Sequence, residues 1–161
     1  MVSDLLIREA ELADAEALFE THQDSVQNLC AGAYSEAHLA VWFDGRSPEI
    51  YRPAIEAHQI WLAEQHGRVL GFVGFVPGEV TILFVRKEAA GLGLGKHLFA
   101  LGVAKAESGF PGPLTVVATQ NSQRFYQAHG FLPVEEQTFV RGNPELHFKV
   151  VRMQRVSEAK Q

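Results

Sequence analysis

A glycine-rich segment directly after an apolar strand constrains the fold of this chain more than any other feature. The residues from Thr81 to Val85 have the length and composition of a buried strand, and a helical pattern continues to about Glu107. Glycine allows positive φ and close approach of the backbone to a ligand, and a first helical turn has unpaired N–H groups and a positive dipole end. The sequence therefore predicts a pyrophosphate cradle formed by Gly91, Leu92, Gly93, Leu94, Gly95 and Lys96.

Two better-known phosphate motifs fit this segment poorly. A P-loop needs a Ser or Thr after its Gly-Lys pair to hold magnesium, but His97 follows Gly95-Lys96 here. The dinucleotide pattern G-x-G-x-x-G needs a third glycine where this chain has Lys96. A nucleotide-binding module is therefore disfavoured, while a glycine turn that serves only tight packing remains an alternative.

The periodicity of apolar residues predicts helices interleaved with a mixed sheet. A short strand at 5–8 precedes helices at 14–29, 35–43 and about 50–57. Three antiparallel strands follow at 59–64, 69–76 and 80–85, with turns between them. After the glycine-rich segment and its helix come a strand at 114–118, a helix at 122–129 and a hairpin of strands at 134–140 and 145–153. This order indicates an α/β domain.

Length and composition indicate one soluble domain. The 161 residues favour a single domain over 1–156, with a frayed tail at 157–161. The net charge of −5 comes with no basic stripe, so a nucleic-acid partner is not expected. Charged residues near the start argue against a signal peptide, and Pro77-Gly78 interrupts the most apolar region, so no membrane partner is expected. A single cysteine, Cys30, fits a reducing compartment, and a cytoplasmic location follows by default.

Two separated motifs in the expected order resemble those of the GNAT (Gcn5-related N-acetyltransferase) superfamily. The strand and glycine segment are similar to its acetyl-CoA motif, an apolar-Val strand end followed by [Gln/Arg]-x-x-Gly-x-[Gly/Ala]. The segment from Asn121 to Phe131, with Phe125-Tyr126 and Gly130-Phe131, resembles its second signature. Ala90 departs from the family pattern, because relatives have Gln or Arg at that position. The resemblance implies a mixed, mostly antiparallel sheet of six to seven strands flanked by about four helices.

The resemblance also implies acetyl-CoA as cosubstrate and a primary amine as acceptor, attacked directly in a ternary complex. It places the pantetheine arm against Leu83, Phe84 and Val85, with the Val85 N–H as a candidate donor to the carbonyl oxygen. It aligns Tyr126 with a tyrosine that hydrogen-bonds the leaving thiolate; packing of a half-buried ring is the alternative. Asn121 would bond the pantetheine or cap the last helix.

Glu79 is the candidate general base, because some relatives carry a glutamate on this strand. Strand alternation puts Glu79, Thr81, Leu83 and Val85 on one face unless a bulge intervenes. A solvated turn carboxylate is the alternative interpretation, and bulk water could remove the proton instead. Cys30 is expected to lie away from the donor motif, which disfavours an acyl-cysteine intermediate.

The acceptor cannot be identified from the sequence. Tyr34, His38 and Trp42 would form either an acceptor wall or a packing stripe on one helix. The acceptor is a small-molecule or protein amine, a homodimer is left open, and no metal is expected, because the seven histidines lack ligand spacing. The alternative function is a non-catalytic acyl-CoA-binding sensor with the same fold.

Overall fold

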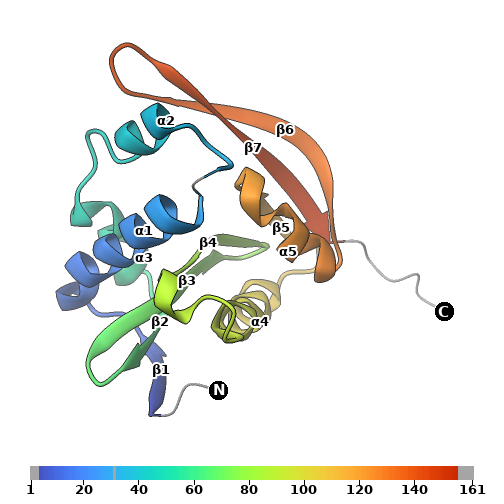
Figure 1. Cartoon of the computed structure of the whole chain (residues 1–161). Coiled ribbons are helices and arrows are strands. Elements are labelled where there is room, and N and C mark those ends of the chain that lie inside the picture. Colours follow the sequence, from blue (N-terminus) through green and yellow to red (C-terminus); the bar gives the residue numbers. More distant parts are fainter. Residues whose placement is uncertain (1–3, 31, 156–161) are drawn as a thin grey trace.

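The computed structural model describes residues 4–30 and 32–155 of the chain (Figure 1). Within these residues a seven-stranded sheet runs in the order β1-β2-β3-β4-β5-β7-β6, and its only parallel pair is β4 with β5. The strands are β1 (Leu5–Glu9), β2 (Ile60–Gln65), β3 (Arg68–Val76), β4 (Glu79–Val85), β5 (Thr115–Ala118), β6 (Phe131–Arg141) and β7 (Leu146–Arg155). The expected fold class is confirmed, and the strands agree closely with their predicted positions except that the final hairpin is longer.

Five α-helices lie within the described residues, several of them preceded by a short 3-10 turn. They are α1 (Ala15–Leu29), α2 (Glu36–Val41), α3 (Arg52–Glu56), α4 (Leu94–Glu107) and α5 (Gln123–Ala128). The predicted start of α2 is correct, because the Ser35 hydroxyl accepts from the His38 N–H and caps the helix. The frayed tail predicted at 157–161 lies outside the described residues.

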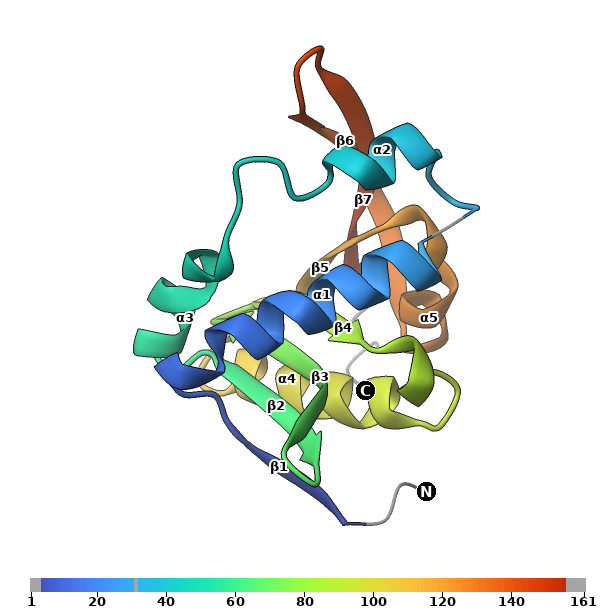
Figure 2. The same ribbon diagram turned by 60° about the vertical axis from the view of Figure 1, so that its left-hand side comes forward.

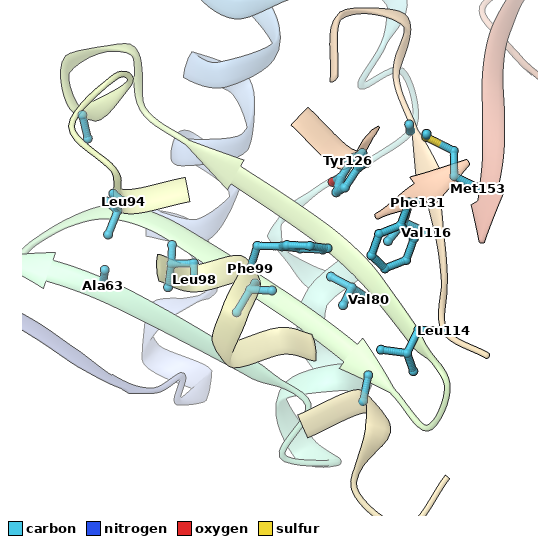
Figure 3. Packing of buried hydrophobic residues seen from close by; sticks show 14 of the residues in the cluster. Ala63, Val80, Leu94, Leu98, Phe99, Leu114, Val116, Tyr126, Phe131 and Met153 are labelled. Carbon is cyan, nitrogen blue, oxygen red and sulfur yellow. The ribbon is translucent and has the colours of Figure 1, made fainter. Parts of the chain in front are cut away.

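The sheet carries a hydrophobic core on each face. Helices α1 and α3 cover one face of β2 to β4, where Leu18 and Ile55 pack against Phe72. Helices α4 and α5 lie on the opposite face (Figure 2), and their side chains, with Phe99 at the centre, pack against the strands and Phe131 (Figure 3). Each helix buries one apolar stripe, which is the main source of stability for short helices in a domain of this kind.

The parallel pair β4–β5 is much shorter than either strand. Its register contains only Glu79 opposite Thr115 and Val80 opposite Val116. From Thr81 onward β4 therefore has no partner on its β5 side, and the two strands separate toward the glycine-rich segment (Figure 1). An unpaired strand edge inside a sheet presents free backbone donors and acceptors, and this opening determines where a ligand can enter.

A β-bulge interrupts β4 just past the last residue that pairs with β5. Gly74 of β3 pairs with Ile82 and Phe75 pairs with Val80, so that Thr81 is the extra residue. Val80 consequently packs into the α4-side core together with Leu83, three residues later. Regular alternation would have put those two side chains on opposite faces. A bulge therefore does intervene, and the common face expected in its absence for Glu79, Thr81, Leu83 and Val85 does not form.

Helix α2 attaches the long β6–β7 hairpin to the body of the protein (Figures 1 and 2). The Tyr34 hydroxyl donates to the Lys149 carbonyl at 2.7 Å and accepts from the Gln120 N–H at 3.0 Å. Trp42 is buried edge-on against Phe148 of β7. Tyr34 precedes the helix rather than lying on it, and both aromatic side chains are packing residues. The structure therefore supports the packing alternative for Tyr34 and Trp42, whereas His38 is only partly buried.

Candidate active site

A cavity of about 450 Å³ occupies the opening between β4 and β5. Its first wall, the β4 wall, consists of β4 and the glycine-rich segment. Its second, the α5 wall, runs from the end of β5 into α5. The C-terminal half of α1 closes the third side. The lining residues are Ser25, Leu29, Cys30, Val80, Thr81, Ile82, Leu83, Phe84, Val85, Ala90, Gly91, Gly93, Gly95, Lys96, Val117, Thr119, Asn121, Ser122, Phe125 and Tyr126.

The predicted cradle residues divide into two groups. Gly91 and Gly93 have φ of +81° and +84°, and no atom lies within 4 Å of where a Cβ would stand on either. Such residues hold an open backbone turn immediately before α4, with their amides available to a ligand. Gly95 and Lys96 also line the cavity, whereas the Leu92 side chain is exposed and that of Leu94 is buried in the α4-side core. Leu92 and Leu94 are the two predicted cradle residues outside the lining.

Two cationic side chains near the cradle, Arg86 and Lys96, differ in their contacts and exposure. Arg86 is buried, its Nε donates to the Val69 carbonyl at 2.7 Å, and its Nη2 lies 3.8 Å from Glu20. It therefore holds β3 and α1 rather than facing the cavity. Lys96 is exposed and lines the cavity, and Ala90 lines it as well. Lys96 is the side chain placed to supply positive charge where Ala90 supplies none.

The β4 wall offers mainly backbone. Leu83 and Val85 turn their side chains toward the α4 core, and Phe84 turns to the α1 side. Behind Phe84, His22 stacks on its ring at 4.0 Å and shares a 2.7 Å hydrogen bond between Nδ1 and the Tyr51 hydroxyl. Burial lowers the pKa of His22 to about 3, so this imidazole is neutral. It supports the wall from behind and does not line the cavity.

Tyr126 is the central side chain of the α5 wall. Only 6% of the residue is exposed, and its ring packs edge-on against Phe99 (Figure 3) and Phe125, with ring centroids 5.3 Å apart in each pair. Its hydroxyl forms no hydrogen bond with any residue that the structure describes. Burial raises the pKa of the phenol well above its usual value of about 10, because the phenolate would be desolvated. The hydroxyl is thus a neutral donor available to a ligand in the cavity.

Glu79 lies at the narrow end of the opening and is not among the cavity-lining residues. Because its neighbour Val80 points into the α4 core, Glu79 points to the opposite face, which carries α1. The side chain is half-buried, and desolvation raises the pKa of its carboxyl. This carboxyl has no ion pair among the described residues. A partly desolvated carboxyl with a raised pKa has the properties of a general base, although it lies beside the cavity rather than in it.

Asn121 and Cys30 join the α5 wall to α1. The Asn121 amide donates to the Leu29 carbonyl at 3.2 Å, and α5 has no side-chain cap, so Asn121 does not cap this helix. Cys30 is buried and lines the cavity, which corrects the expectation that it lies away from the donor motif. Burial nevertheless raises the pKa of its thiol to about 11, so the thiolate population is small at neutral pH.

Several lining residues were not predicted from the sequence. Thr119, Ser122 and Phe125 flank the predicted Asn121 and Tyr126, so the local motif pointed to their neighbourhood. Ser25 and Leu29 carry no such signal, because they reach the cavity only through the packing of α1 on the sheet. Among the described residues, no group of three or more His, Cys, Asp or Glu side chains could hold a metal ion. Within the same residues no helix is long and apolar enough to cross a membrane.

Comparison with known proteins identifies the family. Residues 30–153 match the family model of the acetyltransferase (GNAT) domain, and the chain belongs to this family. A GCN5-related N-acetyltransferase from Rhodopseudomonas palustris superposes with a TM-score of 0.77 at 22% identity, covering 94% of this chain and 97% of its own. No curated protein sequence matches the chain significantly.

Two further similar structures were determined with coenzyme A or acetyl-CoA. PaiA N-acetyltransferase from Thermoplasma acidophilum, in complex with coenzyme A, has a TM-score of 0.74 at 21% identity over 95% of this chain and 99% of its own. YncA, a putative acetyltransferase from Salmonella typhimurium with acetyl-CoA, has a TM-score of 0.69 at 20% identity over 98% and 96%. At such identities the likeness establishes the fold.

Proposed function

We propose that this protein is an N-acetyltransferase that moves the acetyl group of acetyl-CoA to a primary amine by direct attack in a ternary complex. The observation that carries the proposal is the opening between β4 and β5. It joins the open glycine turn at one end to the Tyr126 hydroxyl in the α5 wall, and Glu79 lies beside its narrow end. A long donor with a diphosphate at one end and a thioester at the other suits a cavity of this shape.

The residues present fit the donor in four respects. The open turn at Gly91 and Gly93, with the amides that begin α4, would bind the diphosphate. Lys96 would add positive charge at the same end. The free edge of β4 from Leu83 to Val85 would pair with the amide groups of the pantetheine arm, in the manner of an added strand. Asn121 lines the opposite wall and would contact the arm there.

Negative charge develops on two atoms during transfer, the carbonyl oxygen and the sulfur, and the chain offers a neutral hydrogen-bond donor for each. The backbone N–H of Val85 is the candidate donor to the carbonyl oxygen, in a site where water is partly excluded. Tyr126 would donate a hydrogen bond to the sulfur as the thiolate leaves. Because burial raises the pKa of this phenol, hydrogen bonding is favoured over complete loss of its proton.

The attacking amine must lose a proton, and Glu79 is the candidate acceptor of that proton. An alkyl amine with a pKa near ~10.4 is almost wholly protonated at neutral pH. The raised pKa of the Glu79 carboxyl makes it a better base than an exposed glutamate. Cys30 is not assigned a covalent role, because its buried thiol has a pKa of about 11 and is a poor nucleophile.

An amine-panel screen that follows release of the CoA thiol tests the proposal. Turnover with at least one primary amine, dependent on acetyl-CoA, is the expected result. Tight acetyl-CoA binding with no thiol release above the hydrolytic background for any amine would refute transferase activity. That outcome would instead favour the acyl-CoA-binding sensor.

A further inference from the structure

Arg152 differs from the other arginines that are not fully exposed. Four of these make hydrogen bonds: Arg8 to Asp14, Arg86 to Val69, Arg141 to Val140 and Arg155 to Glu107. Arg152 makes none to any residue that the structure describes, although its side chain is only 34% exposed. Its nearest charged partner is Glu135, with Nε 3.7 Å from Oε1, which is too long for a hydrogen bond. A guanidinium has five donors, so this one retains its full capacity for a ligand.

The position of Arg152 connects it to the cavity. On β7 it pairs directly with Val117 of β5, and directly paired residues of antiparallel strands lie on the same face. Val117 lines the cavity and is 41% exposed. The neighbouring pair, Val116 and Met153, is buried in the α4-side core. Val117 and Arg152 therefore lie on the opposite face of the sheet, the face to which Glu79 also points.

The carboxylate next to Arg152 is held by another residue. Glu135 is exposed and accepts a 3.0 Å hydrogen bond from the Gln137 amide on its own strand. Its ion pair with Arg152 is long and partly exposed, and pairs of that kind contribute little. A ligand carboxylate could replace it with two parallel N–H···O bonds, for which the guanidinium fork is suited.

We propose that Arg152 binds a carboxylate of the acceptor, so that the substrate is an amine that also carries a carboxylate. This inference rests on the proposed transferase function and specifies its substrate class. Arg152 lies two strands from β4, at least roughly 10 Å across the sheet. The exposed apolar Val117 lies between, which suits a methylene chain. The acceptor therefore has several carbon atoms between its amine and its carboxylate.

Three matched amines test the proposal: 6-aminohexanoate, 6-aminohexanamide and hexane-1,6-diamine. They share the amine and the chain length and differ in the distal charge. We expect kcat/KM for the carboxylate to exceed that for the amide by at least roughly tenfold, as a charge-assisted hydrogen bond would give. Arg152→Gln should bring the ratio close to one, mainly through KM. Arg152→Lys should retain part of it, because an ammonium keeps the charge without the fork.

Two further variants separate substrate binding from general effects. Arg155→Gln is the matched control: it removes an arginine three residues along β7 whose hydrogen bond goes to Glu107 of α4, and it should leave the ratio unchanged. Glu135→Gln removes the competing carboxylate and should raise the preference for 6-aminohexanoate severalfold. Thermal melting of each variant verifies that it is folded.

The outcomes distinguish this inference from the proposed function. Equal kcat/KM for all three amines, or preference for the diamine, would overturn the role of Arg152 and leave the transferase activity standing. If none of the three amines released thiol, the result would count against the proposed transferase function for these acceptors. A binding measurement would then test the role of Arg152 separately. Calorimetry on the protein–CoA complex would compare 6-acetamidohexanoate with 6-acetamidohexanamide. Tighter binding of the carboxylate that is lost in Arg152→Gln supports the site, and equal binding overturns it.

Discussion

The two walls of the cavity use different parts of the chain. The β4 wall presents main-chain groups: an unpaired strand edge, then a turn held open by Gly91 and Gly93. The α5 wall presents side chains, with Tyr126 and Asn121 among the residues that line the cavity. Substitution on the first wall should therefore act through backbone conformation and charge, and substitution on the second through loss of one specific group.

The largest effect should come from Gly93→Val on the β4 wall. Valine at φ +84° adds backbone strain of roughly 1–2 kcal/mol and fills the open side of the turn. The Kd for acetyl-CoA, measured by calorimetry, should rise by at least about tenfold, since the loss of diphosphate contacts adds to that strain. Gly67→Val is the matched control: Gly67 has φ +78°, equally open surroundings and no place in the cavity. An equal loss of affinity in both variants would show that strain alone is responsible.

Tyr126→Phe tests the side-chain character of the α5 wall. The ring and its packing remain, so the acetyl-CoA Kd and the melting temperature should change little. Loss of the donor to the thiolate should lower kcat by roughly tenfold or more. Tyr51→Phe removes another buried hydroxyl, one that bonds His22 outside the cavity, and should leave kcat close to wild type. Full kcat in Tyr126→Phe would show that water or another group serves the leaving sulfur.

Glu79→Gln tests the residue at the narrow end, where the walls meet. The base must be ionised, so wild-type kcat/KM should rise with pH through the raised pKa of Glu79, and the variant should be slower with a flatter profile. The substitution should have the opposite effect on thermal stability and stabilise the protein at neutral pH. Because folding raises this pKa, the free energy of unfolding falls as pH rises from the unfolded to the folded pKa of Glu79, and the full loss is present above the folded value. The variant should therefore melt higher than wild type at neutral pH and equally below about pH 4, near the unfolded pKa. Identical pH–rate profiles would restrict Glu79 to a structural role.

Ala90→Arg should produce the smallest effect of the four substitutions. It adds a cationic side chain to the β4 wall, which otherwise presents mainly main-chain groups. Arg86 is committed to Val69 and Glu20, so an arginine at position 90 would add to the charge of Lys96. A partly exposed contact to phosphate should tighten acetyl-CoA binding about fivefold, roughly 1 kcal/mol, and the gain should shrink at high salt. Acetylated pantetheine without the diphosphate should show no gain. Equal tightening of both donors would mean that residue 90 does not face the diphosphate.

The glycine turn shows how much local chemistry the sequence carries. The positive φ values of Gly91 and Gly93 and the helix that begins at Leu94 follow from neighbouring residues, because conformational preference and unpaired amides are local properties. The element order and the family were also accessible, since apolar periodicity and two motifs in sequence order suffice for them. The local motif at Asn121 to Phe131 placed Tyr126 on the last helix in the same way.

Other features depend on strand pairings that no local pattern specifies. The bulge at Thr81 arises from the register of β3 on β4. It puts Glu79 and Leu83 on opposite faces of the strand, whereas regular alternation would put them on the same face. A one-residue change in register exchanges the two faces of a strand, so alternation counted along the sequence fails there.

The sequence by itself determined the family, the strand–turn–helix unit that forms the cradle, and the tyrosine on the last helix. Only the tertiary structure decided that β4 and β5 separate after two paired residues, that α1 brings Cys30 into the cavity, and that Arg152 of β7 lies beside Val117. The physical reason is the range of the interactions. Dihedral preferences and helix-end charges act over a few residues, whereas the opening and its neighbours arise from packing between segments far apart in the chain.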